Sequence, residues 1–556
     1  MSVHGKIVVV GGGLAGITAA IALREAGADV MLAEARPRLG GATSSFSRGG
    51  LMVDNGQHVF LRCCVAYRGL LARLGMTGAV ALQDRFDVTV LAPGGRARLR
   101  RTALPGPLHM GNALVGYRLL SPAQRLRVAR AALAMAALNP AREDLDRQRL
   151  GDWLAARGQD EQTRRLLWDL FTVSALNIGG DDANLALAAT VVKTALLGAR
   201  DAADIGVPSV PLGELHGQAA GALLARLGAQ VRLGAKVVAV EALPGGPDGP
   251  GGRWRVRLAG RGGGEGSPPD SAGRVVEADG VVLAVPPAVA ARLAPAGTVT
   301  AGMVGEAAGA GDGPGRPGPA QWRELGTSPI VNVHMIYDRR VTRLPFAAAV
   351  DSPVQWVFDR TGQSGLRSGQ YLAVSLSAAD GYVDVPTSAL RAQFLPAMAD
   401  LFPAARDARV TDFFVTRERR ATLRQVPGCE RLRPGAATAL PGLVLAGAWT
   451  DTGWPDTMEG AVRSGLNAAR VLRQGLAVPG SMGQPARSAT RLAAVPLAGR
   501  QRDTGGTRRP GLVNGPDPVN APDPVNGPGP VNGSGPAGRP VTPGRRSGTA
   551  GPGATA

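Results

Sequence analysis

Residues 6–41 read KIVVVGGGLAGITAAIALREAGADVMLAEARPRLGG, and this stretch decides the fold. The run from Ile7 to Val10 is apolar and β-branched, which is typical of a buried parallel strand. Gly11, Gly13 and Gly16 follow it directly in GxGxxG spacing and open a helical run. This spacing predicts a strand that turns sharply into a helix whose N-terminal amides face a phosphate group.

Each glycine has a separate task in such a loop. Gly11 permits the tight turn, Gly13 lets a pyrophosphate approach the backbone, and Gly16 lets helix and strand pack closely. A second apolar run ends at Glu34, eighteen residues after Gly16, where a carboxylate would meet the ribose of an adenine dinucleotide. The alternative is a glycine-rich turn that binds no ligand. Such a turn would not explain why a strand, a helix, a second strand and a terminal acid follow one another at the spacing of a dinucleotide site. We therefore predict a dinucleotide site.

The composition limits the classes of partner. The 556 residues carry a formal charge of +19, with 44% hydrophobic and 4% aromatic residues. The arginines are scattered and form no basic stripe interleaved with aromatic residues, so we expect no nucleic-acid partner, and an anionic membrane surface fits the charge better. Cys63, Cys64 and Cys429 are too few and badly spaced for a disulfide framework or a metal site, which favours a cytoplasmic protein. No apolar run is long enough to predict a spanning helix.

A second short motif, DNGQH at residues 54–58, concentrates small and polar groups between apolar flanks. A loop of this composition suits the side of a bound ring. The alternative interpretation is a surface hairpin. The nearby Cys63 and Cys64 are interpreted as small buried hydrophobic residues rather than as a redox pair.

Two helices in the middle of the chain bear on the substrate. Ser121 followed by Pro122 predicts the N-cap and first turn of a helix that runs to about Leu138. Residues 183–199 are mostly apolar and are interrupted by Lys193. They are interpreted either as a core helix or as a helix that lines an apolar substrate channel or rests on a bilayer.

The remaining elements fall into two groups and a tail. A small antiparallel meander is predicted over residues 230–240, 254–258 and 274–277, followed by a buried strand over 278–287. A second sheet is predicted over residues 330–337, 354–358 and 371–377, followed by a helix over 388–401. After about Gly480 the chain is rich in Pro, Gly, Ser and Arg and contains a six-residue repeat from Val513. Such a composition cannot bury enough apolar surface to fold, so the tail is predicted to be disordered.

The stretch LAGAWTDTGWPDTMEGAVRSG at residues 445–465 completes the pattern. Together with VVVGGGLAGITAA, EARPRLGG and DNGQHVF it resembles the squalene-associated FAD-dependent desaturases, the family of hydroxysqualene dehydroxylases within the amine oxidase and phytoene desaturase superfamily. The resemblance covers about residues 5–475. The combination of DNGQH with the closing motif is far more specific than GxGxxG alone.

The resemblance implies an α/β fold in which a Rossmann-like FAD-binding domain is interleaved with an α+β substrate domain. The FAD-binding domain would take residues 1–75, 208–295 and 431–478. The substrate domain would take a mainly helical part, 76–207, and a sheet part, 296–430. Residues 479–556 would form the disordered tail.

The resemblance also implies which residues contact FAD. On the pyrophosphate, ribose and adenine side these are Gly11, Gly13, Leu14, Ala15, Gly16, Glu34, Ala35, Arg36, Gly40, Gly41, Ala42 and Val237. On the flavin side they are Gly56, Gln57, Gly447, Ala448, Trp449, Met458 and Ala461. Two positions depart from the wider superfamily, which often has an acid in place of Ala448 and an arginine in place of Ala42.

The implied reaction is the reductive removal of an allylic hydroxyl from hydroxysqualene, a long apolar isoprenoid, which needs hydride and a general acid. His58 is the first candidate for this acid and Asp54 the second. The alternative is that both only hydrogen-bond FAD or backbone, and Asp451 and Asp456 are weaker candidates. No metal is expected.

Two other functions are compatible with the same motifs. One is desaturation of a polyprene, in which the flavin accepts electrons from the substrate instead of donating them. The other is a lipid carrier without catalytic activity, because the same fold serves in proteins that hold prenylated partners. The apolar substrate would come from the membrane, to which the protein would bind peripherally, or directly from the enzyme that makes it.

Overall fold

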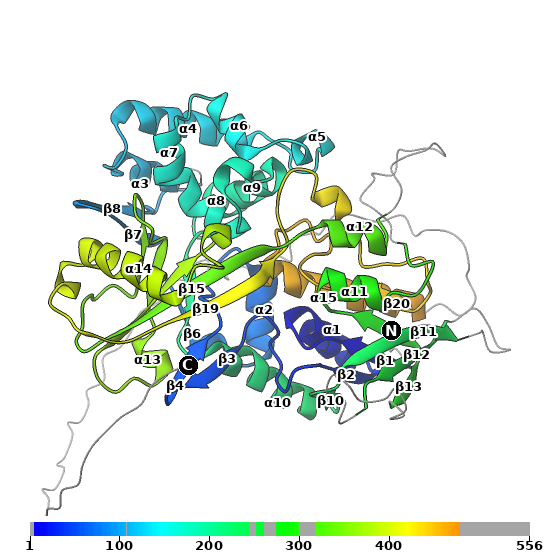
Figure 1. The fold of residues 1–556 in the computed structure, drawn as a ribbon. Coiled ribbons are helices and arrows are strands. Elements are labelled where there is room, and N and C mark those ends of the chain that lie inside the picture. The colour runs from blue at the N-terminus through cyan, green and yellow to red at the C-terminus, as the bar shows by residue number, and fades with distance from the viewer. Residues whose placement is uncertain (1–4, 107, 244–251, 261–273, 300–316, 477–556) are drawn as a thin grey trace, which may run out of the picture. The chain divides into compact units, whose positions relative to one another are not determined.

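The computed structural model describes residues 5–106, 108–243, 252–260, 274–299 and 317–476 (Figure 1). All of them belong to one compact unit, Met1–Gly483. The predicted disordered tail, residues 479–556, lies outside the described residues, as do most residues of the glycine-rich inserts between 244 and 316.

A parallel five-stranded sheet forms the first layer, with the order β10-β2-β1-β14-β20. Its strands come from distant parts of the chain, namely β1 Lys6–Val10, β2 Asp29–Ala33, β10 Gln230–Arg232, β14 Gly280–Leu283 and β20 Leu443–Leu445. Ile7 to Val10 are fully or almost fully buried, as a strand covered on both faces requires. The three segments assigned to the FAD-binding domain thus share this sheet, while the domain boundaries themselves stay a prediction.

The predicted meander is wrong at its first strand. Residues 230–240 do not form one strand, because the chain turns at Gly234, which has a φ of 66°. Before the turn, β10 joins the parallel sheet beside β2; after it, β11 Val237–Leu243 pairs antiparallel with β12 Arg253–Leu258, and β12 with β13 Val275–Ala278. The antiparallel meander is therefore shorter than predicted.

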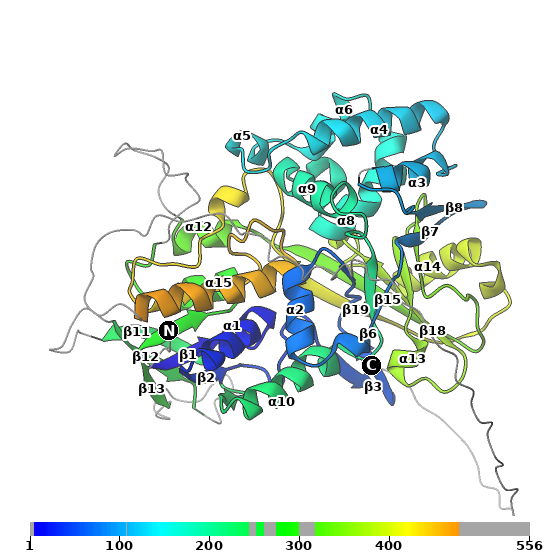
Figure 2. The ribbon, with the colours of Figure 1, turned by 180° about the vertical axis from the view of Figure 1, so that it is seen from behind.

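Two helices cross on one face of the parallel sheet. Helix α1 Leu14–Glu25 follows β1, and α15 Met458–Leu476 packs along it (Figure 2). A Cβ at Gly465 of α15 would lie 2.3 Å from the Ala15 carbonyl oxygen and 2.8 Å from Thr18 Cβ. The two backbones therefore approach as closely as they do only because Gly465 has no side chain.

The second sheet has seven strands in the order β19-β15-β18-β17-β16-β7-β8. They are β7 Asp87–Ala92, β8 Gly95–Arg100, β15 Ser328–Tyr337, β16 Phe346–Ala349, β17 Trp356–Asp359, β18 Gln370–Leu376 and β19 Val410–Thr422. All pairs are antiparallel except β16 with β7. Helix α14 Thr387–Leu401 covers one face with Leu390, Phe394 and Met398.

A layer of helices lies beyond this sheet, at the top of Figures 1 and 2. It contains α3 Gly111–Val115, α4 Pro122–Ala136, α5 Glu143–Asp146, α6 Leu150–Ala155, α7 Glu161–Thr163, α8 Asp169–Leu176 and α9 Leu185–Val191. Ser121 caps α4 in a capping box with Gln124, as its sequence predicts. Residues 183–189 are buried, and a π-helical turn, Val192–Leu196, replaces the second half of the helix predicted there.

Smaller elements connect the layers. They are the hairpin β3 Ser45–Arg48 and β4 Leu51–Asp54, the three-stranded sheet of β5 Phe60–Leu61, β9 Ile205–Pro208 and β6 Val80–Leu82, and the helices α2 Val65–Arg73, α10 Ala219–Arg226, α11 Pro287–Leu293, α12 Pro319–Glu324 and α13 Thr361–Ser364. Asp204, fully buried beside β9, accepts hydrogen bonds from Arg62 and Arg101 and so ties β5 to the edge of the seven-stranded sheet.

The close crossing of α1 and α15 gives a matched pair of substitutions. Gly465→Ala should destabilise the protein by about 1 to 3 kcal/mol, because the methyl group would press on the backbone of α1. Gly475→Ala, on the same helix with open space around it, should be neutral or stabilise by about 0.5 to 1 kcal/mol. Urea unfolding of both variants measures the difference, and equal stabilities would contradict the tight crossing.

Candidate functional site

The glycine loop has the shape of a phosphate cradle. Gly11 has a φ of 106°, and a Cβ at Gly16 would lie 1.9 Å from the Gly11 carbonyl oxygen, so neither position tolerates a side chain. At Gly13, by contrast, a Cβ would meet only Gly41 Cα, at 3.8 Å. Gly13 is the N-cap of α1 and supplies no side-chain cap, so the first-turn amides of α1, including those of Leu14 and Ala15, are available to an anion.

Glu34 directly follows β2 and lies against this loop. Its Oε2 accepts the Gly12 amide at 2.6 Å and its Oε1 accepts the Arg36 amide at 2.7 Å, which fixes the carboxylate. Each oxygen keeps a further lone pair for a ribose hydroxyl. The backbone of Glu34 and Arg36 also bonds to residues 232–235, which brings Val237 to the same side. Ala35 and Arg36 are exposed beside it.

Residues 40–42 form the second wall of the cradle. The Gly40 amide donates to the Gly12 carbonyl at 2.8 Å, and a Cβ at Gly41 would lie 2.8 Å from Gly13 Cα. The Ala42 carbonyl accepts the Asn55 side-chain amide at 2.8 Å. The glycine loop, the 40–42 turn and the DNGQH loop are thereby held side by side.

The closing motif approaches from the other end of the chain. Gly447 has a φ of 141° and follows β20, and Met458 and Ala461 lie in the first turns of α15. Trp449 is only 4% exposed, packs against Trp322 and donates its indole N–H to the Val285 carbonyl at 2.9 Å. Its side chain thus belongs to the protein core, and any contact of Trp449 with a ligand would come from its backbone.

An arginine that the sequence analysis missed holds this motif in place. Arg433 is 1% exposed, and its Nη2 donates to the carbonyls of Ala448, Thr450 and Trp454 at 2.7 to 2.9 Å. Its Nη1 pairs with Glu430 at 2.7 Å. One buried guanidinium therefore sets the path of residues 448–454, although no local pattern around residue 433 signals this.

Glu459 is a second residue that the analysis missed. Its two carboxylate oxygens accept the amides of Ala66 and Tyr67 at 3.2 and 2.8 Å, at the N-terminus of α2, and Arg463 pairs with it at 2.7 Å. The acid of the TMEGAV sequence therefore joins α15 to the segment that follows the DNGQH loop.

Within the DNGQH loop, Asp54 is engaged as an acceptor. Its Oδ1 accepts the Ser45 hydroxyl at 2.6 Å and the Leu212 amide at 2.9 Å, and its Oδ2 pairs with Arg360. All three partners donate to this carboxylate, so Asp54 serves as a hydrogen-bond acceptor that holds the loop against α13. Its role as the second candidate acid stays a prediction.

His58 lies at the end of the same loop. Its Nδ1 is 3.2 Å from the Gly56 carbonyl oxygen, and no partner of Nε2 occurs in the described part of the chain. Burial lowers the pKa of His58 from its ordinary value of 6.5, opposed by the Gly56 carbonyl and the charges of Asp54 and Glu418. His58 is therefore mostly neutral at pH 7 in the protein without ligands.

Two buried acceptors beside His58 have no hydrogen-bond partner among the described residues. They are Oε1 of Gln57 and Oδ1 of Asn332. Asn332 donates through Nδ2 to the Asn55 carbonyl, and a Cβ at Gly56 would lie 3.2 Å from His58 Cε1 and 3.8 Å from Asn332 Nδ2. Because buried polar atoms are normally paired, this spot suits a ligand that donates hydrogen bonds.

The geometry therefore joins an anion cradle, a ribose-binding acid and a polar loop, and the comparison with known proteins agrees with it. A model of the flavin containing amine oxidoreductases matches residues 14–473. The chain belongs to the flavin-containing amine oxidoreductase family. The resemblance and the α/β fold class inferred from the motifs are confirmed.

Individual members of this family differ in what they act on. The chain is 29% identical over 469 residues to a hydroxysqualene dehydroxylase of Rhodopseudomonas palustris, which covers 83% of this chain and 96% of that protein. It is 24% identical over 519 residues to a zeta-carotene desaturase of Zea mays, which covers 83% of this chain and 82% of that protein. The chain also resembles the solved structure of a cyclohexylamine oxidase from Brevibacterium oxydans, with a TM-score of 0.60 and 19% sequence identity. The match covers 86% of this chain and 100% of that chain, and it shows the fold alone.

Membership in this family makes the protein an FAD-dependent oxidoreductase, which sets aside the lipid-carrier reading. The residues present fit FAD, because the open space at Gly13 lies at a helix N-terminus and Glu34 stands beside it. The individual FAD contacts stay predictions. No group of three or more potential metal ligands occurs among the described residues.

The cradle predicts opposite outcomes for two neighbouring glycines. Gly13→Ala should leave the apoprotein as stable as the wild type, since its methyl group meets only Gly41 Cα, but should weaken FAD binding at least about tenfold by occupying the pyrophosphate space. Gly16→Ala should destabilise the apoprotein itself. Thermal unfolding without FAD and flavin titration separate the two effects. Normal FAD affinity in Gly13→Ala would refute the placement.

Arg433 gives a second prediction. Arg433→Met should cost about 3 to 5 kcal/mol of stability, because it leaves the partly buried Glu430 without its partner and three carbonyls without their donor, and Glu430→Gln in the same chain should restore part of it. Arg433→Lys keeps the charge but cannot reach three carbonyls, so it should weaken FAD binding more than stability. Urea unfolding and flavin titration test this, and wild-type FAD affinity in Arg433→Lys would contradict the role given to the clamp.

Proposed function

We propose that this oxidoreductase removes the allylic hydroxyl of hydroxysqualene reductively and gives squalene. The observation that carries the proposal is the 29% identity to a hydroxysqualene dehydroxylase across 96% of that protein's length. The overall change replaces a C–O bond by a C–H bond with two electrons and two protons and releases water.

The chemistry divides between the cofactor and the chain. Reduced FAD, when bound, supplies the hydride. The chain must place a proton on the departing hydroxyl, so that water leaves, and must keep bulk water from the allylic cation that develops. His58 is the proposed proton donor, because its Nε2 has no partner among the described residues and the charge of Glu418 favours its charged form.

The lowered pKa of His58 gives a pH dependence with a definite sign. If the imidazolium donates the proton, the active fraction rises as the pH falls through 6.5 toward the lowered pKa, and turnover should rise with it. His58→Ala should reduce single-turnover rates by about 10² to 10⁴ and abolish this rise while FAD stays bound. A loss below about threefold, or an unchanged pH profile, places the acid elsewhere.

A desaturase is the second candidate, and one feature of the site favours it. A polyprene desaturase must take up a proton, and a histidine that is neutral at pH 7 suits a base better than an acid. The 24% identity to zeta-carotene desaturase supports the same candidate. The direction of electron flow is thus the feature that separates the two proposals.

One paired experiment separates them. The protein with reduced FAD is incubated without oxygen with hydroxysqualene, and in parallel the protein with oxidised FAD is incubated with zeta-carotene, with products read by mass spectrometry. Squalene in the first reaction and no desaturated product in the second support dehydroxylation. Desaturated product without squalene supports the alternative, and no product in either refutes both.

The substrate proposal has a consequence for where the protein works. Transfer of thirty apolar carbons out of water is worth on the order of 20 kcal/mol, at about 0.8 kcal/mol per CH₂-sized group, so a free aqueous substrate is negligible. We therefore propose a cytoplasmic protein that binds the membrane peripherally, or receives substrate from the enzyme that makes it. No helix in the described residues is both long and apolar enough to cross a membrane.

A further inference from the structure

Exposed apolar side chains gather on one part of the helical layer. Leu104, Leu108, Val115, Leu126 and Leu133 are 50 to 68% exposed. They are five of the twelve large hydrophobic residues exposed in the described part of the chain, and they fall within thirty consecutive residues. Single exposed leucines need no explanation, but a cluster on α3, α4 and the turn before them points to a partner.

The same part of the sequence has an unusual charge. Residues 88–142 contain nine arginines and neither aspartate nor glutamate. Five of these arginines pair with acids outside the stretch, namely Arg98 and Arg100 with Asp87, Arg101 with Asp204, Arg127 with Asp160 and Arg142 with Asp144. Arg118 and Arg130 form no ion pair within the described residues. These two arginines therefore bring uncompensated positive charge next to the exposed leucines.

Helix α4 shows how the two kinds of residue are combined. It buries Val128, Ala131 and Met135. On the opposite side, Leu126, Arg130 and Leu133 follow each other at helical spacing and are all exposed. Arg125 donates to the Val115 carbonyl, which fastens the end of α3 against the start of α4. A solvated helix would present charged and polar groups of both signs on this side, not leucine and arginine alone.

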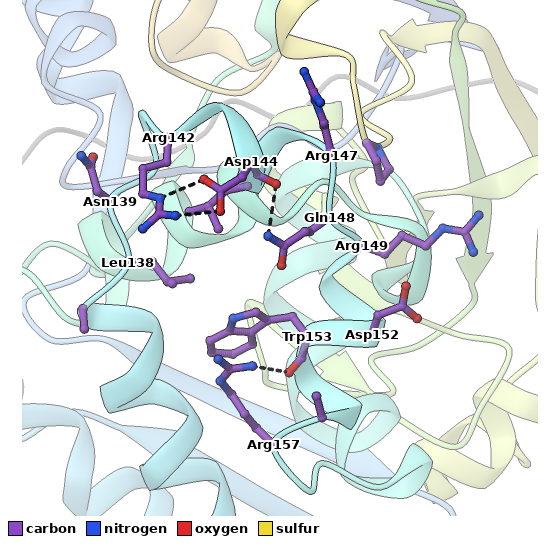
Figure 3. A pocket seen from close by; sticks show the side chains of 14 residues that line it. Leu138, Asn139, Arg142, Asp144, Arg147, Gln148, Arg149, Asp152, Trp153 and Arg157 are labelled. Carbon is purple, nitrogen blue, oxygen red and sulfur yellow. Dashed lines mark hydrogen bonds and ion pairs between the residues drawn. The ribbon is translucent and has the colours of Figure 1, made fainter.

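A cavity of about 680 Å³ opens where α4 ends (Figure 3). Leu138, Leu145, Trp153 and Pro427 line it with apolar surface. Its charged lining consists of Arg142, Arg147, Arg149 and Arg157 together with Asp144 and Asp152, and Asp144 pairs with Arg142. Arg157 lies 3.8 Å over the Trp153 ring. Four arginines against two aspartates leave an excess of positive charge beside the apolar walls, which suits an apolar chain that carries an anionic headgroup.

The cavity wall leads toward the flavin site. Pro427 belongs to the segment that continues to the Arg433 clamp, and Asp146 of α5 accepts the amides of Gly428 and Glu430 in that segment. Gln425, two residues earlier, accepts the amide of Asp456 in the closing motif. The helical layer and the site are thus joined through residues 425–433.

We propose that residues 104–106 and 108–133, with the cavity at the end of α4, form a docking surface for an anionic lipid bilayer. The leucines of this docking surface enter the acyl region, and Arg118 and Arg130 meet lipid phosphates. The occupant is a bilayer because the exposed leucines stand singly among arginines on α3, α4 and the turn before them rather than forming one groove for a peptide. The inference deepens the proposed function, since the docking surface would serve a substrate dissolved in the bilayer.

Vesicle co-sedimentation of the full-length protein with bound FAD tests the docking surface. Vesicles of phosphatidylcholine with phosphatidylglycerol should bind it, more weakly at high salt, and vesicles of phosphatidylcholine alone should bind it at least about tenfold less. Leu126→Ser/Leu133→Ser and Arg118→Glu/Arg130→Glu should each lower binding to anionic vesicles at least about tenfold. Flavin absorbance and thermal unfolding confirm that the variants are folded.

Matched controls lie away from the docking surface. Val238→Ser/Val275→Ser changes two exposed valines of the meander, and Arg340→Glu/Arg343→Glu changes two exposed arginines between β15 and β16. Both should bind anionic vesicles like the wild type. Residues 477–556 are the same in all variants, so any binding by them is common to all.

The vesicle experiments can overturn the docking surface independently of the proposed function. If the docking-surface variants sediment with vesicles like the wild type, or if the controls lose binding equally, the proposal is overturned. If those variants instead change a dimer into a monomer in analytical ultracentrifugation and leave vesicle binding intact, the surface binds a second copy and the proposal is also overturned. Detergent-solubilised hydroxysqualene separates the two hypotheses, because failure of turnover there refutes the proposed function and leaves the docking result unchanged.

Discussion

The absence of a side chain at Gly16 is the constraint on which the site depends. A Cβ there would overlap the Gly11 carbonyl oxygen, so α1 can start directly against the end of β1 only with glycine at this position. This start places the α1 amides at the mouth of the cradle, where the 40–42 turn and Glu34 meet them. Gly465 of α15 likewise has no side chain where α15 meets the backbone of α1, and this close contact brings the closing motif near the start of α1.

Polar contacts of one short loop connect the 40–42 turn beside the glycine loop with the seven-stranded sheet. Asn55 donates to the Ala42 carbonyl on one side and to Glu418 of β19 on the other, while its own carbonyl accepts Asn332 of β15. Asp54 adds the pair with Arg360. The DNGQH loop thus connects the 40–42 turn with the seven-stranded sheet, which explains why its polar residues are so dense.

Sequence could predict the elements whose causes are local. The strand, loop and helix from Ile7 to Glu25 follow from apolar periodicity and glycine spacing, and the start of α4 follows from the capping box at Ser121. The Arg433 clamp, the pair of Arg360 with Asp54 and the unpaired Oδ1 of Asn332 could not be predicted, because each depends on residues that are distant in the sequence. Gly234 was visible in the sequence, but only the pairing of Val231 with Leu32 shows that the strand before it leaves the meander.

The strand order of the parallel sheet also has a consequence for how the chain folds during synthesis. Its central strand, β1, is among the first segments made, whereas its edge strand β20 lies more than four hundred residues later. Pairings of such sequence separation form slowly and leave strand edges open in the meantime. During synthesis β1 and β2 therefore have unpaired edges until β10 and β14 are made. The flavin site, which also needs the closing motif after β20, is among the last parts of the molecule to form.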